Sequence, residues 1–160
     1  MVPRTSYTAY GFLIDSEIPC ADFISAFGSP EVNISRGFVP EAESGLDQVG
    51  AFCFAAPGRF LVSVPGRLRF CVADGDSITA HGEPGCDPDA LWVFISGAGF
   101  GALLYQRGLI PMHGSAIATK SGAVLITGPS GAGKSALAAE FYRRGYQIIA
   151  DELSAISLNP

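Results

Sequence analysis

The pattern of apolar and polar positions divides the chain into a β-rich first part and a mixed second part. Between Tyr7 and His81 the apolar residues come in short runs, rich in β-branched and aromatic side chains and separated by turn residues. The pattern predicts a small antiparallel module with strands over residues 7–14, 32–35, 59–64, 68–72 and 77–81. The stretch 30–47 is rich in Pro, Glu, Gly and Ser, and is predicted to be largely exposed loop around one strand.

The longest apolar run, from Ala90 to Tyr105, predicts a buried helix. Asp87 can cap its N-terminus, Pro88 suits its first position, and Gly108 can end it. The run is shorter than the ~20 residues that span a bilayer, and glycines interrupt it. It therefore favours packing inside the fold over membrane insertion.

A hairpin and a strand–loop–helix–strand unit are predicted after this helix. Residues 109–119 and 123–127 form the predicted hairpin, with its turn at Lys120-Ser121-Gly122. Residues 135–144 predict a helix that Gly145 ends. A further strand is predicted over residues 146–150.

The loop in this unit has the sequence GPSGAGKS, a complete G-x-x-x-x-G-K-[ST] phosphate-binding motif. Its residues are Gly128, Pro129, Ser130, Gly131, Ala132, Gly133, Lys134 and Ser135. Glycines let the backbone N–H groups approach a triphosphate, while Lys134 can reach its β- and γ-phosphates and Ser135 can ligate Mg²⁺. A plain glycine-rich turn is the weaker interpretation, because Lys120 and Lys134 are the only lysines and one fills the required position.

Asp151 and Glu152 are the second chemical signal, because they directly follow the predicted strand 146–150. Ligands of open α/β sheets lie beyond the carboxyl ends of the strands, so these acids are expected to face the phosphates. One could hold Mg²⁺ and the other could accept a proton from an attacking hydroxyl. The alternative interpretation is a helix cap or a solvated turn.

Composition narrows the classes of function. The 160 residues are 48% hydrophobic, enough for a core, and the net charge of −5 argues against a general nucleic-acid or anionic-membrane surface. No basic segment followed by an apolar one opens the chain, which predicts a cytoplasmic protein. The four cysteines are expected to be reduced and mostly buried. A zinc site formed by Cys71, His81 and Cys86 is conceivable, but the irregular spacing of these residues argues against it.

Four segments together resemble the catalytic domain of the HPr kinase/phosphorylase family. In chain order they are HGSAIA at 113–118, the loop at 128–135, RGY at 144–146 and ADE at 150–152. Their order and spacing match over about residues 108 to 156. The upstream region is more loosely similar to the N-terminal part of HPr-kinase-related serine kinases.

This resemblance implies an α/β (α+β) protein-serine kinase akin to phosphoenolpyruvate carboxykinase, using ATP and Mg²⁺ on a serine of a protein or peptide. It implies a metal role for Asp151, a base role for Glu152 and a place near the active site for His113. The family has two aspartates where this chain has Asp151 and Glu152, so Glu152 is one methylene longer than the family pattern.

The residue pattern predicts a β-rich module over 1–86 and a linking helix over 87–108, and the resemblance implies the start of a truncated kinase domain over 109–160. An incomplete sheet would expose an edge, which favours association with a second copy. Two other functions stay open: a non-catalytic nucleotide-binding or interaction module, and a P-loop ATPase or GTPase. The guanine-reading sequence N-K-x-D does not occur in the chain.

Overall fold

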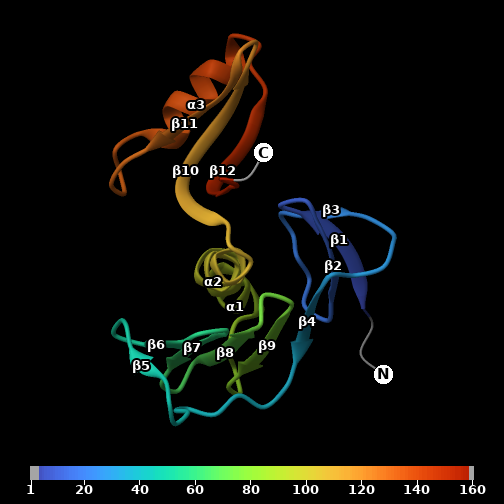
Figure 1. Ribbon diagram of the computed structural model, residues 1–160, viewed down its shortest axis with the longest axis vertical. Coiled ribbons are helices and arrows are strands. Elements are labelled where there is room, and N and C mark those ends of the chain that lie inside the picture. Colours follow the sequence, from blue (N-terminus) through green and yellow to red (C-terminus); the bar gives the residue numbers. More distant parts are fainter. Residues whose placement is uncertain (1–3, 159–160) are drawn as a thin grey trace. The chain divides into compact units, whose positions relative to one another are not determined.

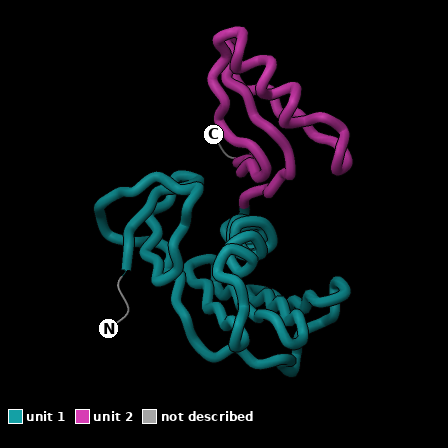
Figure 2. The backbone as a smooth tube through the Cα atoms, turned by 180° about the vertical axis from the view of Figure 1, so that it is seen from behind, with its two compact units in different colours: residues 1–108 teal, residues 109–160 magenta. Residues whose placement is uncertain are grey.

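The computed structural model describes residues 4–158 and divides into two compact units, Met1–Gly108 and Leu109–Pro160 (Figure 2). Strands dominate, and helices lie in both units, so the predicted mixture of helices and strands is confirmed.

Unit 1 contains a nine-stranded sheet in the order β3-β1-β2-β4-β9-β8-β7-β6-β5 (Figure 1). The strands are β1 (Thr5–Ala9), β2 (Phe12–Ser16), β3 (Ile24–Ser25), β4 (Val32–Arg36), β5 (Asp47–Gln48), β6 (Cys53–Ala56), β7 (Arg59–Val64), β8 (Leu68–Ala73) and β9 (Ser77–Gly82). Four of the predicted strands correspond to β4, β7, β8 and β9. The prediction of a purely antiparallel module is wrong at β4, which pairs in parallel with both β2 and β9. The long connection that carries β5 to β8 allows this parallel return.

The prediction of one strand over residues 7–14 is also wrong, because a hairpin turn interrupts it. Tyr10 and Gly11 join β1 to β2 with φ angles of 54° and 84°. A two-residue hairpin turn of this kind needs positive φ at both central residues, which tyrosine rarely adopts. Only one of the two central residues, Gly11, is therefore of the type that usually indicates such a turn in a sequence.

The predicted helix is present and begins as expected. It consists of α1 (Pro88–Phe94), a π-helical segment η1 (Ile95–Gly99) and α2 (Phe100–Gln106). The Asp87 carboxylate accepts a hydrogen bond of 3.0 Å from the N–H of Asp89, and Pro88 occupies the first turn. Both features begin the helix in the way that the sequence predicts.

Only one face of this helix is buried, so the prediction of a buried helix is half right. The buried side chains are Leu91, Trp92, Ile95, Phe100, Leu103 and Leu104. By contrast, Val93 is 67% and Tyr105 75% exposed. By length and composition alone the 19-residue stretch could also cross a membrane. Within unit 1 its buried face lies against β8.

Aromatic rings fix the helix to the N-terminal part of unit 1. The ring of Phe100 is fully buried, and its centroid lies 5.0 Å from that of Phe23 and 5.6 Å from that of Tyr10. Trp92 lies beside both phenylalanines and donates a hydrogen bond of 2.8 Å to Asp22. Such aromatic clusters contribute strongly to the stability of a core.

All four cysteines are free, but only Cys20 and Cys71 are buried, whereas Cys53 and Cys86 are half-buried. Burial raises the pKa of the Cys20 thiol to about 11. In the part of the chain from residue 4 to 158, no three His, Cys, Asp or Glu side chains gather into a metal cluster. The zinc site considered from the sequence is therefore not assembled.

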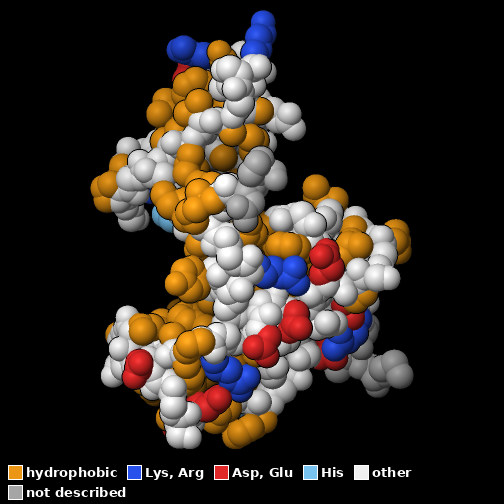
Figure 3. Space-filling view, viewed as in Figure 1, with side chains coloured by type: hydrophobic (Ala, Val, Ile, Leu, Met, Phe, Trp, Pro, Cys, Tyr) orange, Lys and Arg blue, Asp and Glu red, His pale blue; other side chains and the backbone are white. Residues whose placement is uncertain are grey.

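Unit 2 is a three-stranded antiparallel sheet in the order β11-β10-β12, with helix α3 packed against it (Figure 1). Its elements are β10 (Ile110–Thr119), β11 (Gly122–Thr127), α3 (Lys134–Arg143) and β12 (Ile148–Ile156). The predicted hairpin between β10 and β11 is confirmed, and Gly145, with φ 88°, follows the end of α3. On the face seen in Figure 3, apolar side chains cover much of this unit.

We expect Phe100→Ala to lower the free energy of unfolding by about 3–5 kcal/mol, because it empties the centre of the aromatic cluster. Tyr105→Ala on the same helix is the control, and is expected to change it by less than about 0.5 kcal/mol. Urea unfolding followed by the fluorescence of Trp92, the single tryptophan, measures both. Equal effects of the two substitutions would show that Phe100 does not anchor the helix.

Candidate functional site

The motif loop connects β11 to α3, and two of its glycines have a left-handed backbone conformation. Gly131 and Gly133 have φ angles of 79° and 86°, in the left-handed region that strongly favours glycine. Gly133 directly precedes the helix, which starts at Lys134. The loop therefore leads directly into the start of α3, where the first backbone N–H groups of a helix have no partner within the helix.

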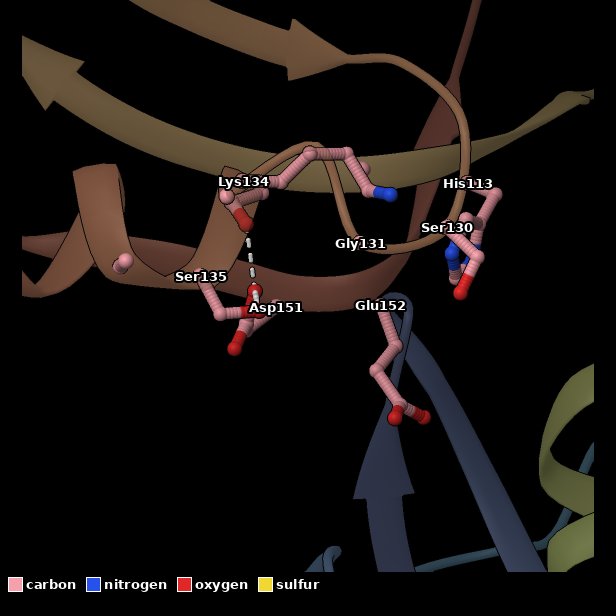
Figure 4. Close-up of a pocket in the computed structure, with 11 residues that line it drawn as sticks. His113, Ser130, Gly131, Lys134, Ser135, Asp151 and Glu152 are labelled. Atoms are coloured by element: carbon pink, nitrogen blue, oxygen red, sulfur yellow. Dashed lines mark hydrogen bonds between the residues drawn. The ribbon is translucent and has the colours of Figure 1, made fainter.

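Lys134 turns back across its own loop (Figure 4). Its Nζ donates hydrogen bonds of 3.0 Å to the carbonyl of Gly128 and 3.1 Å to that of Pro129. Both acceptors are neutral, so a phosphate group is a stronger partner for the ammonium group than either carbonyl.

The side chain of Asp151, on β12, contacts the start of α3 through a hydrogen bond. Its Oδ1 accepts a hydrogen bond of 3.2 Å from Ser135 and a second one from Ser115 on β10 (Figure 4). Ser135 and Asp151 are 16 positions apart in the sequence, so the pairing of strands and the packing of α3 create this contact. Asp151 therefore lies beside the first turn of α3; that both acids face bound phosphates stays a prediction.

The two acids were predicted to follow directly after a strand, and this prediction is wrong. Asp151 and Glu152 lie inside β12, opposite Ser115 and Gly114 of β10, and not beyond the end of a strand. The reason is the length of β10, whose ten residues offer pairing partners as far as Ile156. Local sequence signals carry no information on that non-local pairing.

The backbone of Glu152 explains how neighbouring acids reach one cavity. Side chains of a regular strand alternate between faces, so consecutive residues would point in opposite directions. Glu152 has a φ of 105°, which is unusual for a residue with a side chain and departs from regular strand geometry. Both acids line the same cavity, and in Figure 4 the Glu152 carboxylate extends away from Lys134.

The cavity has a volume of about 330 Å³ and lies entirely within unit 2. Eight predicted site residues line it: His113, Ser130, Gly131, Gly133, Lys134, Ser135, Asp151 and Glu152. The other three, Gly128, Pro129 and Ala132, belong to the loop but are not part of the lining.

Three lining residues were not predicted from the sequence: Gly114, Ser115 and Ala136. A Cβ atom on Gly114 would lie 2.4 Å from the carbonyl oxygen of Ile126, so only glycine fits between the neighbouring strands. Ser115 stands two residues after His113, on the same face of β10. That spacing was the available signal for Ser115.

The donor set suits Mg²⁺ better than zinc. Residues 4–158 contain no cluster of three His, Cys, Asp or Glu that could hold a metal by itself. Mg²⁺ commonly takes one or two protein oxygen ligands and completes its shell with water and phosphate. The carboxylate of Asp151 and the hydroxyl of Ser135, 3.2 Å apart beside the loop, fit that requirement.

Comparison with known proteins shows which proteins this chain is similar to. The chain is similar to HPr kinase/phosphorylases. It is 30% identical to the proteins of that name from Listeria welshimeri, Listeria monocytogenes and Listeria innocua, over 137 residues and 82% of its length. The match spans 41% of the length of those relatives. No protein-family model and no solved structure matches the chain.

This similarity supports the HPr-kinase-like relationship that the four motif segments predicted. It extends over more of the chain than those segments do. The more distant relation to phosphoenolpyruvate carboxykinase stays a prediction.

We expect Gly114→Ala to destabilise the sheet of unit 2 by about 1–3 kcal/mol, because the new methyl group would collide with backbone of β11. Hydrogen exchange of the β10 and β11 amides measures this as faster local opening. Gly101→Ala, where a Cβ meets open space, is the control and is expected to leave those amides unchanged. Slow, wild-type exchange in the Gly114 variant would contradict the close packing.

We expect Glu152→Gly to be more stable than Glu152→Ala by about 1 kcal/mol. Both variants remove the carboxylate, but only glycine relieves the unfavourable positive φ. The same hydrogen-exchange measurement on the β12 amides compares the two. An alanine variant as stable as the glycine variant would show that the backbone at this position is not strained.

Proposed function

We propose that the chain carries the nucleotide-binding part of an ATP- and Mg²⁺-dependent serine kinase of the HPr kinase/phosphorylase family. Its substrate is a serine of a protein or peptide. The observation that supports this most is the hydrogen bond between Ser135 and Asp151. It joins a phosphate-binding sequence to an acid from another strand, as a metal–nucleotide site requires.

The loop binds the triphosphate through its backbone and one charge. N–H groups at the start of α3 point toward the phosphates, and the positive end of the helix dipole adds to their attraction. Lys134 leaves the carbonyls of Gly128 and Pro129 and pairs with the phosphates instead. This charge-assisted pairing is the stronger one.

Ser135 and Asp151 would hold Mg²⁺ beside the phosphates. Bound there, the ion neutralises charge on the phosphate oxygens. Ser135 keeps its lone pairs for this role because it acts as the donor toward Asp151.

Glu152 is proposed as the base. Its carboxylate has no hydrogen bond or ion pair with any residue in the described range 4–158, whereas Asp151 accepts two hydroxyl donors. As the acceptor serine oxygen forms a bond to the γ-phosphorus, the bond to the β-bridging oxygen breaks and the serine proton passes to Glu152. His113, exposed on the cavity wall, would contact the transferred phosphate or the acceptor.

Two further assignments follow from this proposal. The first is that the chain works in the cytoplasm, where ATP is abundant. The edge strands β11 and β12 of the three-stranded sheet are the places where a second copy would associate.

We expect Lys134→Ala to weaken the binding of Mg-ATP on the order of 10- to 100-fold, because a charged donor to phosphate is lost. Calorimetric titration of the 160-residue chain measures it. Lys120→Ala is the matched control: it removes the other lysine, which lies in the exposed hairpin turn, and should bind as wild type.

Equal affinities of the Lys134 and Lys120 variants would contradict the proposal. Binding without phosphotransfer to any serine would favour the non-catalytic nucleotide-binding module. Steady release of phosphate without an acceptor would favour an ATPase.

A further inference from the structure

Ser115 is a buried hydroxyl that the proposed reaction does not use directly. It lies on the central strand β10, is 1% exposed, and is paired with Asp151 across the sheet. Its Oγ donates a hydrogen bond to Oδ1 of Asp151. Among residues 4–158, that carboxylate is the acceptor to which the Ser115 hydroxyl is bonded.

Asp151 needs such an anchor because its own position is exposed. An exposed aspartate on a strand has several accessible rotamers, and each would present its oxygens in a different direction. Here Ser115 and Ser135 approach the same oxygen, Oδ1, from a neighbouring strand and from the helix start. Two donors on one oxygen fix the direction of the carboxylate.

This arrangement also leaves the other oxygen open. In the described part of the chain, Oδ2 of Asp151 receives no hydrogen bond and forms no ion pair. A carboxylate held by one oxygen and free at the other is ready to bind a cation.

We propose that Ser115 is a positioning residue that holds Asp151 toward the loop and thereby sets the affinity of the nucleotide site for Mg²⁺. The inference rests on the proposed function, since it assigns a role within the same site. Groups that orient a metal ligand commonly change metal affinity 10- to 100-fold when they are removed.

A purely structural role for Ser115 makes a different prediction. A buried hydroxyl that only satisfies a neighbouring oxygen would affect stability when removed, and the requirement for Mg²⁺ would not change. The dependence of nucleotide binding on metal therefore separates the two roles.

The test compares Ser115→Thr with Ser115→Val in the 160-residue chain. The two side chains have the same shape and differ in the hydroxyl, so any effect of the added methyl group cancels. ATP binding is titrated by calorimetry at increasing Mg²⁺ concentration and again in EDTA. Ser115→Ala is a second, smaller variant in case valine prevents folding.

We expect the valine and alanine variants to need about tenfold more Mg²⁺ for half-maximal binding than the threonine variant. Their ATP affinity in EDTA is expected to agree within about twofold, because the loop is intact. Equal Mg²⁺ requirements, or an equal loss of affinity with and without metal, would overturn the role of Ser115.

Failure of the proposed function is recognised separately, as a wild-type chain that binds no ATP. The contact is then tested by urea unfolding of Ser115→Val, Asp151→Ala and the double variant. We expect the double variant's unfolding equilibrium constant to depart about fivefold from the product of the single effects. Independent effects would overturn the inference that Ser115 holds Asp151.

Discussion

The register between β10 and β12 is the constraint on which the site depends. It places Ser115 beside Asp151 and Gly114 beside Glu152. A slip of one residue would turn every side chain of β12 to the opposite face, and Asp151 would no longer reach Ser135 on α3. The metal and phosphate chemistry proposed here therefore follows from strand pairing as much as from the loop.

Local signals predicted much of the fold. These signals act over a few residues, and each appears where the sequence indicated. They are the glycines of the loop, the cap at Asp87, the turn at Lys120-Ser121-Gly122 and the glycine after α3. Elements that depend on distant partners were missed or misplaced. The parallel pairing of β4 and the length of β12 both depend on strands far away in the sequence.

The same distinction applies to the site. Lys134, Ser135 and the two acids could be proposed from the sequence because their chemistry or spacing is unusual. Ser115 was missed because serine is chemically ordinary in a strand, and its importance arises when β10 and β12 pair. The strained backbone of Glu152 could not be predicted from the sequence either, because nothing in the neighbouring residues indicates a positive φ.

Similarity and geometry support the functional proposal independently. Similarity to HPr kinase/phosphorylases covers most of this chain but 41% of those relatives. The geometry concerns unit 2 alone, where Lys134, a serine hydroxyl and two acids line one cavity. Hydrogen exchange with and without Mg-ATP tests most directly whether these groups form one nucleotide site. The account predicts that nucleotide slows exchange in residues 128–136 and 150–153 together; protection of neither segment, or of the loop without β12, would contradict it.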